Sequence, residues 1–335
     1  MNAGNLNCGL ARLGRLMAVL WLVLWSAVVI AAGPGYEVRE IRSGVYWLSD
    51  GAYNTIFLVS PRGVIAVDPL PTLGARYLEA VRSVTDQPVT HVIYSHAHAD
   101  HIGGASFMPR GAVIIAQRDT ADLLHTRADP RRPEPTVVFD HDYTLTVGGQ
   151  TLVLSDKGTN HSAGNLFIYA PAQKVLMLVD VVYPGYMPYP HLGIAVDVDG
   201  YELAHRQALA YDFTDFIGGH VDRPGTRADV QASLDFVRDL RAQAVASLAE
   251  ESFPAYLQRT AGRGLQTWFA HDDYEQERVE ACLRRMVEPW GDRLKGADRF
   301  LRSHCWTMIV ALVIDVQARD GVIVNAKAAY AAEAN

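Results

Sequence analysis

Between residues 36 and 220 the chain alternates short apolar runs with turn-forming residues, a pattern that predicts β-strands joined by tight turns. Asp50-Gly51 separates the first two runs in the way expected of a hairpin. A helix is predicted over 73–84, just before a buried strand at 89–94. The predicted strands are 46–48, 55–59, 64–67, 89–94, 113–116, 137–139, 143–147, 151–154, 165–169 and 175–179. The order sheet, helix, sheet, which occurs twice, favours sheets packed between helices.

Beyond residue 225 the spacing of apolar residues changes to the period of a helix. Thr226 followed by Asp229 resembles a capping box, which would begin the first helix there. The segment 305–314 is apolar almost throughout but too short to cross a membrane, so we expect a buried helix. The apolar stripes are Val230, Leu234, Val237 and Leu248, followed by Val279, Cys282, Leu283 and Met286. The region 225–335 is therefore predicted to be all-helical.

The N-terminal segment has a different character. Arg12 and Arg15 precede an uncharged run, 16–32, in which Ser26 is the only polar side chain. A positive end followed by an apolar stretch and small residues is typical of a secretory signal. The run of 17 residues is also close to the lower limit for spanning a bilayer, so an uncleaved anchor is the alternative. We expect an exported protein, periplasmic or secreted, in which 1–32 is a signal peptide or an N-terminal membrane anchor.

Composition excludes some classes of protein. With 30 Lys+Arg against 37 Asp+Glu the formal charge is −7, which provides no positive field for a nucleic acid, and we expect no such partner. Three cysteines are too few for a fold built on disulfides. In an exported protein Cys282 and Cys305 could pair, but we expect two buried thiols because Cys282 lies on an apolar helix face. Composition does not specify an oligomeric state.

The residues that could carry chemistry are concentrated after the predicted strand 89–94. Four candidate metal ligands follow it within six residues: His96, His98, Asp100 and His101. Two histidines spaced by two in an extended segment point the same way and can hold one ion. Asp100 and His101 are adjacent and must diverge, which suits a second ion nearby. Imidazole combined with carboxylate fits a borderline cation such as zinc. A solvated polar loop is the weaker interpretation, because such loops rarely gather four ligands after a buried strand.

This string, His-x-His-x-Asp-His, resembles the signature of the metallo-β-lactamase superfamily. Asp68 matches the acidic residue that ends an early strand and supports the site from behind. His161 matches the third histidine, which opens the second half of the fold. Asp180 matches the residue that bridges both metals in the hydrolase members, and His220 matches the last histidine. One departure is Val179, where members commonly have glycine before the bridging aspartate.

The resemblance covers residues 40–222 and implies an α/β fold, a four-layer αββα sandwich with metals at one edge between its sheets. We therefore expect a metallo-β-lactamase-like domain over 36–224 and an all-helical extension over 225–335. Two zinc ions are the cofactors that the resemblance implies, with iron or manganese as alternatives. The implied ligands are His96, His98 and His161 for the first metal, Asp100, His101 and His220 for the second, and Asp180 as the bridge.

Two such cations would supply hydroxide at neutral pH from a shared water and would polarise the group under attack. Asp100 has a second carboxylate oxygen that can orient this hydroxide, so it is the expected catalytic residue. The predicted function is hydrolysis of a small activated ester, thioester, lactone, lactam or phosphoester. The alternatives are a non-catalytic periplasmic metal-binding accessory or relay protein, and a single-iron oxygenase of the same fold. In either enzyme the expected partner is a small-molecule substrate.

Three further features bear on the substrate. The segment 183–191 is rich in tyrosines stiffened by three prolines, and it would form an apolar wall beside the metals or pack against the helical region. His191 follows Asp180 by one loop, which makes it a candidate for lining the pocket. Lys157 could hold a substrate carboxylate, although a solvated lysine is the simpler interpretation.

Overall fold

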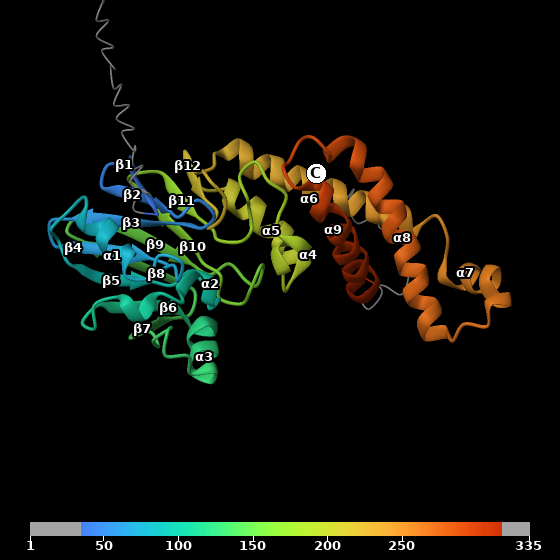
Figure 1. Cartoon of the computed structure of the whole chain (residues 1–335), viewed down its shortest axis with the longest axis horizontal. Coiled ribbons are helices and arrows are strands. Elements are labelled where there is room, and N and C mark those ends of the chain that lie inside the picture. The colour runs from blue at the N-terminus through green and yellow to red at the C-terminus, as the bar shows by residue number, and fades with distance from the viewer. Residues whose placement is uncertain (1–34, 317–335) are drawn as a thin grey trace, which may run out of the picture. The chain divides into compact units, whose positions relative to one another are not determined.

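The computed structural model describes residues 35–316 and builds them around two β-sheets (Figure 1). The seven-stranded sheet contains, in spatial order, β1 (Glu37–Arg42), β2 (Val45–Ser49), β3 (Asn54–Ser60), β4 (Gly63–Val67), β5 (Val89–Ile93), β6 (Val113–Gln117) and β7 (Val137–Phe139). The five-stranded sheet contains, in spatial order, β12 (Asp215–Ile217), β11 (Val175–Met177), β10 (Phe167–Ala170), β9 (Gln150–Ser155) and β8 (Asp142–Val147). The signal peptide or membrane anchor predicted over 1–32 lies outside the described residues.

The two sheets face each other across one apolar core. Strands place alternate side chains on opposite faces, so each strand contributes every second residue to this core. Trp47 and Ile56 from the first sheet meet Leu154 and Ile168 from the second, and all four are at most 1% exposed. The inner faces therefore pack as a sandwich, with the ends of both sheets left free to carry loops.

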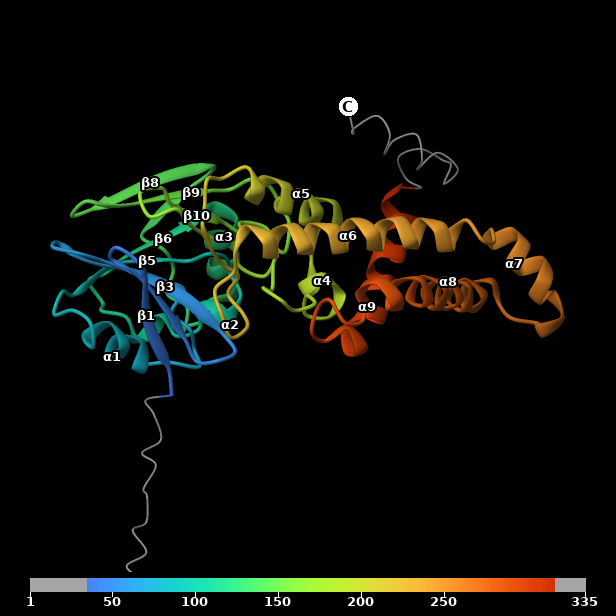
Figure 2. The same ribbon diagram turned by 90° about the horizontal axis from the view of Figure 1, so that it is seen from above.

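Helices cover both outer faces of the sandwich (Figure 2). Tyr77 of α1 and Leu124 of α3 pack on the first sheet, and Tyr201 of α5 and Phe236 of α6 share a core with the second. This layer order confirms the predicted αββα fold. The helices are α1 (Arg76–Arg82), α2 (Ala99–Ile102), α3 (Arg118–Arg127), α4 (Pro190–Ile194), α5 (Val198–Leu209), α6 (Arg227–Leu248), α7 (Phe253–Thr260), α8 (Thr267–Trp290) and α9 (Ala297–Ala311).

The first helix of the C-terminal region, α6, begins at the capping residues that the sequence predicts. Thr226 and Asp229 form the expected capping box at the start of α6. This helix packs on α5 as well as on α8 and α9, so it belongs to the sandwich and to the helical region alike. The predicted division at residue 225 therefore stays a prediction. Among residues 35–316 no helix has both the length and the apolar composition needed to cross a membrane.

The sequence analysis does not predict two of the strands, β1 and β12. β1 carries charged residues on an exposed edge, and β12 has only three residues, so neither shows an apolar run. The expectation of two free thiols is wrong, because Cys282 of α8 and Cys305 of α9 form a disulfide, with their Cα atoms 5.9 Å apart. Both cysteines lie on apolar helix faces that pack against each other. Burial on such a face brings the thiols together rather than isolating them.

Candidate metal centre

Strand ends bring the predicted ligands to one edge of the sandwich. β5 ends at Ile93, just before the segment that carries His96 and His98. In the second sheet Met177 of β11 pairs in parallel with Ile217 of β12, so the segments that follow both strands emerge side by side. These segments carry Asp180 and His220. His161 comes from the loop between β9 and β10.

The first ligand set consists of His96, His98, His161 and Asp180, whose ligand atoms all lie within 4.8 Å of one another. His161 Nε2 is 2.9 Å from His98 Nδ1 and 3.2 Å from Asp180 Oδ2. His96 Nε2 is 3.5 Å from the same aspartate oxygen. His96, His161 and Asp180 are buried, so this half of the centre is enclosed by protein.

The second ligand set consists of Asp100, His101 and His220, again within 4.8 Å of one another. His101 Nε2 is 3.2 Å from His220 Nε2. Asp180 reaches this set too, because its Oδ2 is 3.1 Å from His101 and its Oδ1 is 2.8 Å from His220. The structure thus brings all seven predicted ligands together, with Asp180 between the two sets. That they bind metal ions stays a prediction.

The arrangement of these atoms fits divalent cations. His96 Nε2 is buried and has no hydrogen-bond partner within residues 35–316, while its Nδ1 lies 2.9 Å from the Ser95 hydroxyl. A buried nitrogen left unpaired costs about 1–3 kcal/mol, which coordination would offset. Two pairs of imidazole nitrogens also face each other, at 2.9 Å and 3.2 Å. Imidazole and carboxylate are ligands that zinc, iron and manganese all accept.

Burial and the contacts with Asp180 together set the protonation states of the predicted ligands. Burial lowers the pKa of His96 well below its ordinary value and that of His98 to about 4, so both imidazoles are neutral at pH 7. Burial alone would raise the pKa of Asp180, but the nearby His101 and His161 hold it well below the ordinary range. Asp180 is therefore a carboxylate, and His96 and His98 keep a lone pair for coordination. Burial alone would lower the pKa of His101, but Asp180 raises it to about 9, so a cation in the second ligand set has to displace the proton of His101.

Backbone contacts behind the ligands hold these segments in place. Asp68 is fully buried after β4, and its Oδ1 accepts a hydrogen bond of 2.8 Å from the backbone N–H of Ser95. Asn54 donates to the carbonyl of His220 at 2.7 Å, and Asn165 donates to that of Val179 at 2.9 Å. Each bond ties a strand end to the segment that carries a ligand.

Val179 does not turn Asp180 away from the histidines. A Cβ atom at Gly219 would lie 2.6 Å from Val179 Cγ1 and 3.1 Å from His101 Cε1, and Gly219 has a φ of +85°. Only glycine fits there without strain. The larger side chain before the aspartate is therefore accommodated by a glycine on the neighbouring segment, which follows β12.

Aromatic rings flank the second ligand set. Tyr53 and Tyr183 both lie close to the His220 ring, with centroids 4.5 Å and 5.5 Å away. The Tyr183 hydroxyl is 3.4 Å from Asp180 Oδ1. The sequence singles out Tyr183 through its aromatic loop. It gives no signal for Tyr53, whose place depends on the pairing of the first sheet with the second.

The rest of segment 183–191 turns away to the helical region. Tyr186 lies near Lys295, with 3.3 Å between its hydroxyl and the amine, and His191 Nδ1 is 3.0 Å from the Thr307 hydroxyl. His191 therefore does not join the ligands. Tyr183 lies beside the predicted ligands, whereas Tyr186 and His191 pack against the helical region, as the alternative prediction for this loop expects. Lys157 lies over the ring of Tyr211 at 5.5 Å and belongs to neither ligand set.

The backbone of α4 is left-handed. His191, Leu192, Gly193 and Ile194 have φ values of 60°, 55°, 68° and 59°. Each non-glycine residue in this conformation costs roughly 1–2 kcal/mol, so the turn stores several kcal/mol that other contacts must offset. Such strain clusters at functional sites.

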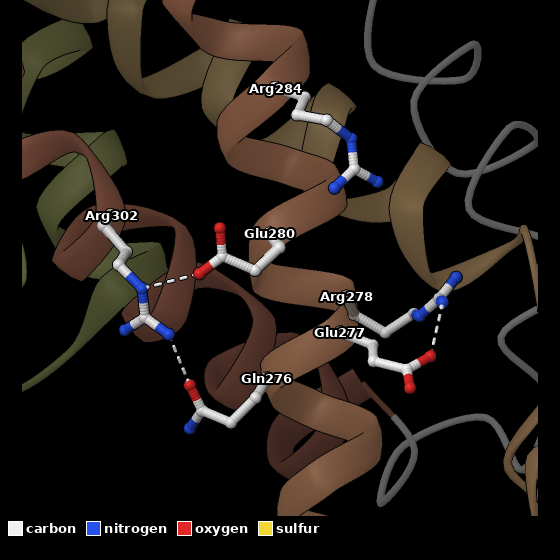
Figure 3. A pocket seen from close by; sticks show the side chains of 6 residues that line it. All are labelled: Gln276, Glu277, Arg278, Glu280, Arg284 and Arg302. Carbon is white, nitrogen blue, oxygen red and sulfur yellow. Dashed lines mark hydrogen bonds and ion pairs between the residues drawn. The ribbon is translucent and has the colours of Figure 1, made fainter.

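A hollow on the surface of α8 and α9 is lined by none of the predicted ligands (Figure 3). Arg302 there pairs with Glu280 and Gln276, and Arg278 pairs with Glu277. These charged groups bind each other, so the hollow does not resemble the set of converging nitrogen and oxygen atoms at the candidate metal centre.

Comparisons with known proteins bear on the family and the fold. A family model described as the metallo-beta-lactamase superfamily matches residues 48–247. The 2,4-dinitroanisole O-demethylase subunit alpha of Nocardioides sp. strain JS1661 is 27% identical over 290 residues, which cover 83% of this chain and 81% of that protein. The metallo-beta-lactamase type 2 of Elizabethkingia meningoseptica is 25% identical over 206 residues, covering 58% of this chain and 79% of that protein. A solved metallo-beta-lactamase from Pontibacter korlensis shares the fold, with a TM-score of 0.54 and 23% identity over 61% of this chain and 99% of that one.

Proposed function

Because the chain belongs to the metallo-β-lactamase superfamily, we propose that it is a metal-dependent hydrolase of small organic molecules that works with two divalent cations. The observation that carries the proposal is the position of Asp180. One of its oxygens is 2.8 Å from His220, and the other is 3.1–3.5 Å from His96, His101 and His161. A carboxylate shared between two ligand sets is suited to two neighbouring cations rather than to one.

The site residues would have three roles: to bind the cations, to orient the attacking water and to border the substrate. The first ligand set would hold one cation and the second ligand set the other, with Asp180 contacting both. Bound there, divalent cations supply hydroxide at neutral pH and polarise a carbonyl group. Asp100 is the open ligand, since its side chain is 46% exposed. Its free oxygen can accept a hydrogen bond from the attacking water and orient it toward the substrate. The rings of Tyr53 and Tyr183 provide an apolar border beside His220.

For the substrate we propose a small activated ester, thioester, lactone or lactam. The β-lactamase relatives support carbonyl substrates, but they cover only about three fifths of this chain. A match over 83% of the chain has to include part of the helical region, and the relative with that match is named an O-demethylase. An activated aryl methyl ether is therefore the second candidate, because a hydroxide nucleophile can also displace a leaving group from an electron-poor ring.

We also propose that the protein is exported, to the periplasm or beyond. The apolar run 16–32 after two arginines supports this, and so does the disulfide between Cys282 and Cys305, since disulfides persist in oxidising compartments. Attachment through residues 16–32 is part of the same proposal. Dividing cells into periplasmic, membrane and cytosolic fractions tests it, and a wholly cytosolic protein would refute it.

Metal content and activity measured on one preparation test the main proposal. Protein purified without added metal should hold about two zinc ions, or two manganese or iron ions, per chain by elemental analysis. It should hydrolyse p-nitrophenyl acetate or a simple lactone, lose this activity on dialysis against a strong chelator, and regain it with zinc or manganese. One iron per chain with oxygen-dependent turnover would point to the oxygenase. Full occupancy without turnover on esters, lactones, lactams or 2,4-dinitroanisole would point to the accessory protein.

A further inference from the structure

The left-handed turn Pro190–Ile194 is held from outside the sandwich, by α9 of the helical region. The N–H of His191 donates to the Ser303 hydroxyl at 3.2 Å, and the N–H of Leu192 donates to His304 Nδ1 at 3.1 Å. His304 is fully buried. α4 lies beside α9 in both views of the molecule (Figure 1 and Figure 2). A strained turn persists only where its surroundings hold it, and here those contacts come from residues more than a hundred positions away.

The same turn also lies against the segment that carries Asp180. A Cβ atom at Gly193 would be 2.8 Å from the Tyr183 hydroxyl and 3.0 Å from the carbonyl oxygen of Asp180. Just beyond the turn, the N–H of Val196 donates to the carbonyl of His161 at 3.1 Å. Backbone contacts therefore run from α9 through the turn to two of the predicted ligands.

The segment also carries exposed apolar side chains. Ile194 is 59% exposed and Val196 is 70% exposed, while Ala195 between them packs against the core of the helical region. Exposing two such side chains on one short segment has a cost in water, which a bound apolar group would remove.

We propose that His304 is a positioning residue for substrate binding: it holds the left-handed turn so that Ile194 and Val196 form an apolar wall that contacts the substrate. The helical region is then part of the enzyme's specificity rather than an appendage. The proposal rests on the proposed function for its substrate, and its ligand is the acyl chain or ring of a small apolar molecule. The disulfide supports the arrangement, because it joins α9 to α8 one residue after His304.

Variants of His304 test the positioning step. His304→Leu removes the acceptor of the Leu192 N–H, whereas His304→Asn keeps an oxygen near the place of Nδ1. His205→Leu is the matched control, because His205 is also fully buried and hydrogen-bonded but contacts Ser233 and Tyr201 rather than the turn. Metal content, hydrogen exchange of the turn and the kinetics of p-nitrophenyl acetate and hexanoate are measured for each variant and for wild type.

We expect His304→Leu to keep its metal and its kcat while its KM for the hexanoate rises about fivefold or more, since the wall contributes binding rather than chemistry. The amides of residues 191–193 should exchange faster, and those of 95–104 should not. His304→Asn should stay within about twofold of wild type. His205→Leu should lower the melting temperature and leave the acetate-to-hexanoate preference unchanged.

Removal of the wall itself completes the test. Ile194→Ser and Val196→Ser should each reduce the preference for the hexanoate, by up to about fourfold for each methylene that loses its contact. Val287→Ser is the control, because Val287 is a similarly exposed apolar residue on α8.

An unchanged ester preference in both Ile194→Ser and Val196→Ser overturns the wall, and two results overturn the positioning step. One is a His304→Leu variant with the turn exchange and ester preference of wild type. The other is a His304→Asn variant as impaired as His304→Leu, which would leave His304 a purely structural role. If wild type hydrolyses none of the esters, the proposed function fails separately. The positioning step is then decided by hydrogen exchange alone, where unchanged exchange at residues 191–193 refutes it.

Discussion

Replacement of Asp180 by asparagine tests the centre at the point where both ligand sets meet. The substitution keeps the shape of the side chain and one oxygen, and it removes the negative charge. Asp180 Oδ2 is 3.1–3.5 Å from His96, His101 and His161, and Oδ1 is 2.8 Å from His220. If two cations bind among these nitrogens, the substitution removes the negative charge that lies between them.

The size of the effect differs between the two sites. Loss of a ligand or of its support typically costs about ten- to a hundredfold in affinity or activity. The first site retains three imidazoles, His96, His98 and His161, of which two are buried. The second retains two imidazoles and Asp100, whose side chain is 46% exposed. We therefore expect the second site to weaken by about a hundredfold and the first by about tenfold or less.

The assay is a zinc titration against a chromophoric chelator, followed by ester hydrolysis at each metal concentration. Wild type should bind two equivalents tightly, whereas Asp180→Asn should bind one tightly and the second only in excess metal, with activity rising in parallel. Asp222→Asn is the matched control, because Asp222 is an exposed aspartate two residues after His220 that belongs to neither ligand set. Superimposable titration and rate curves for wild type and Asp180→Asn would refute the bridging role.

Three further predictions follow from other parts of the structure. His96→Ala and His98→Ala should each lose metal as well as rate, measured by elemental analysis and initial velocities; full occupancy with full turnover in either would contradict the ligand assignment. Burial lowers the pKa of His205 from 6.5 to about 4, so the folded protein binds fewer protons than the unfolded chain between these values. The contribution of His205 to the free energy of unfolding should then fall by about 3 kcal/mol as the pH drops from about 6.5 to 4. Urea unfolding at each pH should therefore show a shallower dependence of this free energy on pH in His205→Asn than in wild type, and equal slopes would contradict the prediction. Replacing Cys282 and Cys305 together by serine should lower the free energy of unfolding by about 3 kcal/mol, and unchanged chemical denaturation would argue against the bond.

The family and the layered fold follow from local patterns in the sequence. Alternating apolar residues mark most of the strands, and the capping residues Thr226 and Asp229 mark the start of α6. The four ligands from His96 to His101 follow a buried strand, and this string carries most of the family resemblance. Strand ends in a sandwich gather at common edges, and this brings the segments that follow β5 and β11 together; the segment with His220 follows β12, which the sequence does not predict. β1 and β12 were missed because an exposed charged edge and a three-residue strand show no such pattern.

The sequence by itself determined the fold and the family, because the apolar runs and the string from His96 to His101 are local patterns. The resemblance to the family then supplied His161, Asp180 and His220 as further candidate ligands. Only the tertiary structure decided how the centre is bordered and supported. Tyr53 meets His220 across two sheets, Gly219 makes room for Val179, and Leu192 bonds to His304 at a separation of 112 residues. Such contacts depend on the packing of distant segments, which no local pattern records. The same holds for the left-handed turn of α4, whose strained backbone persists only because α9 packs against it.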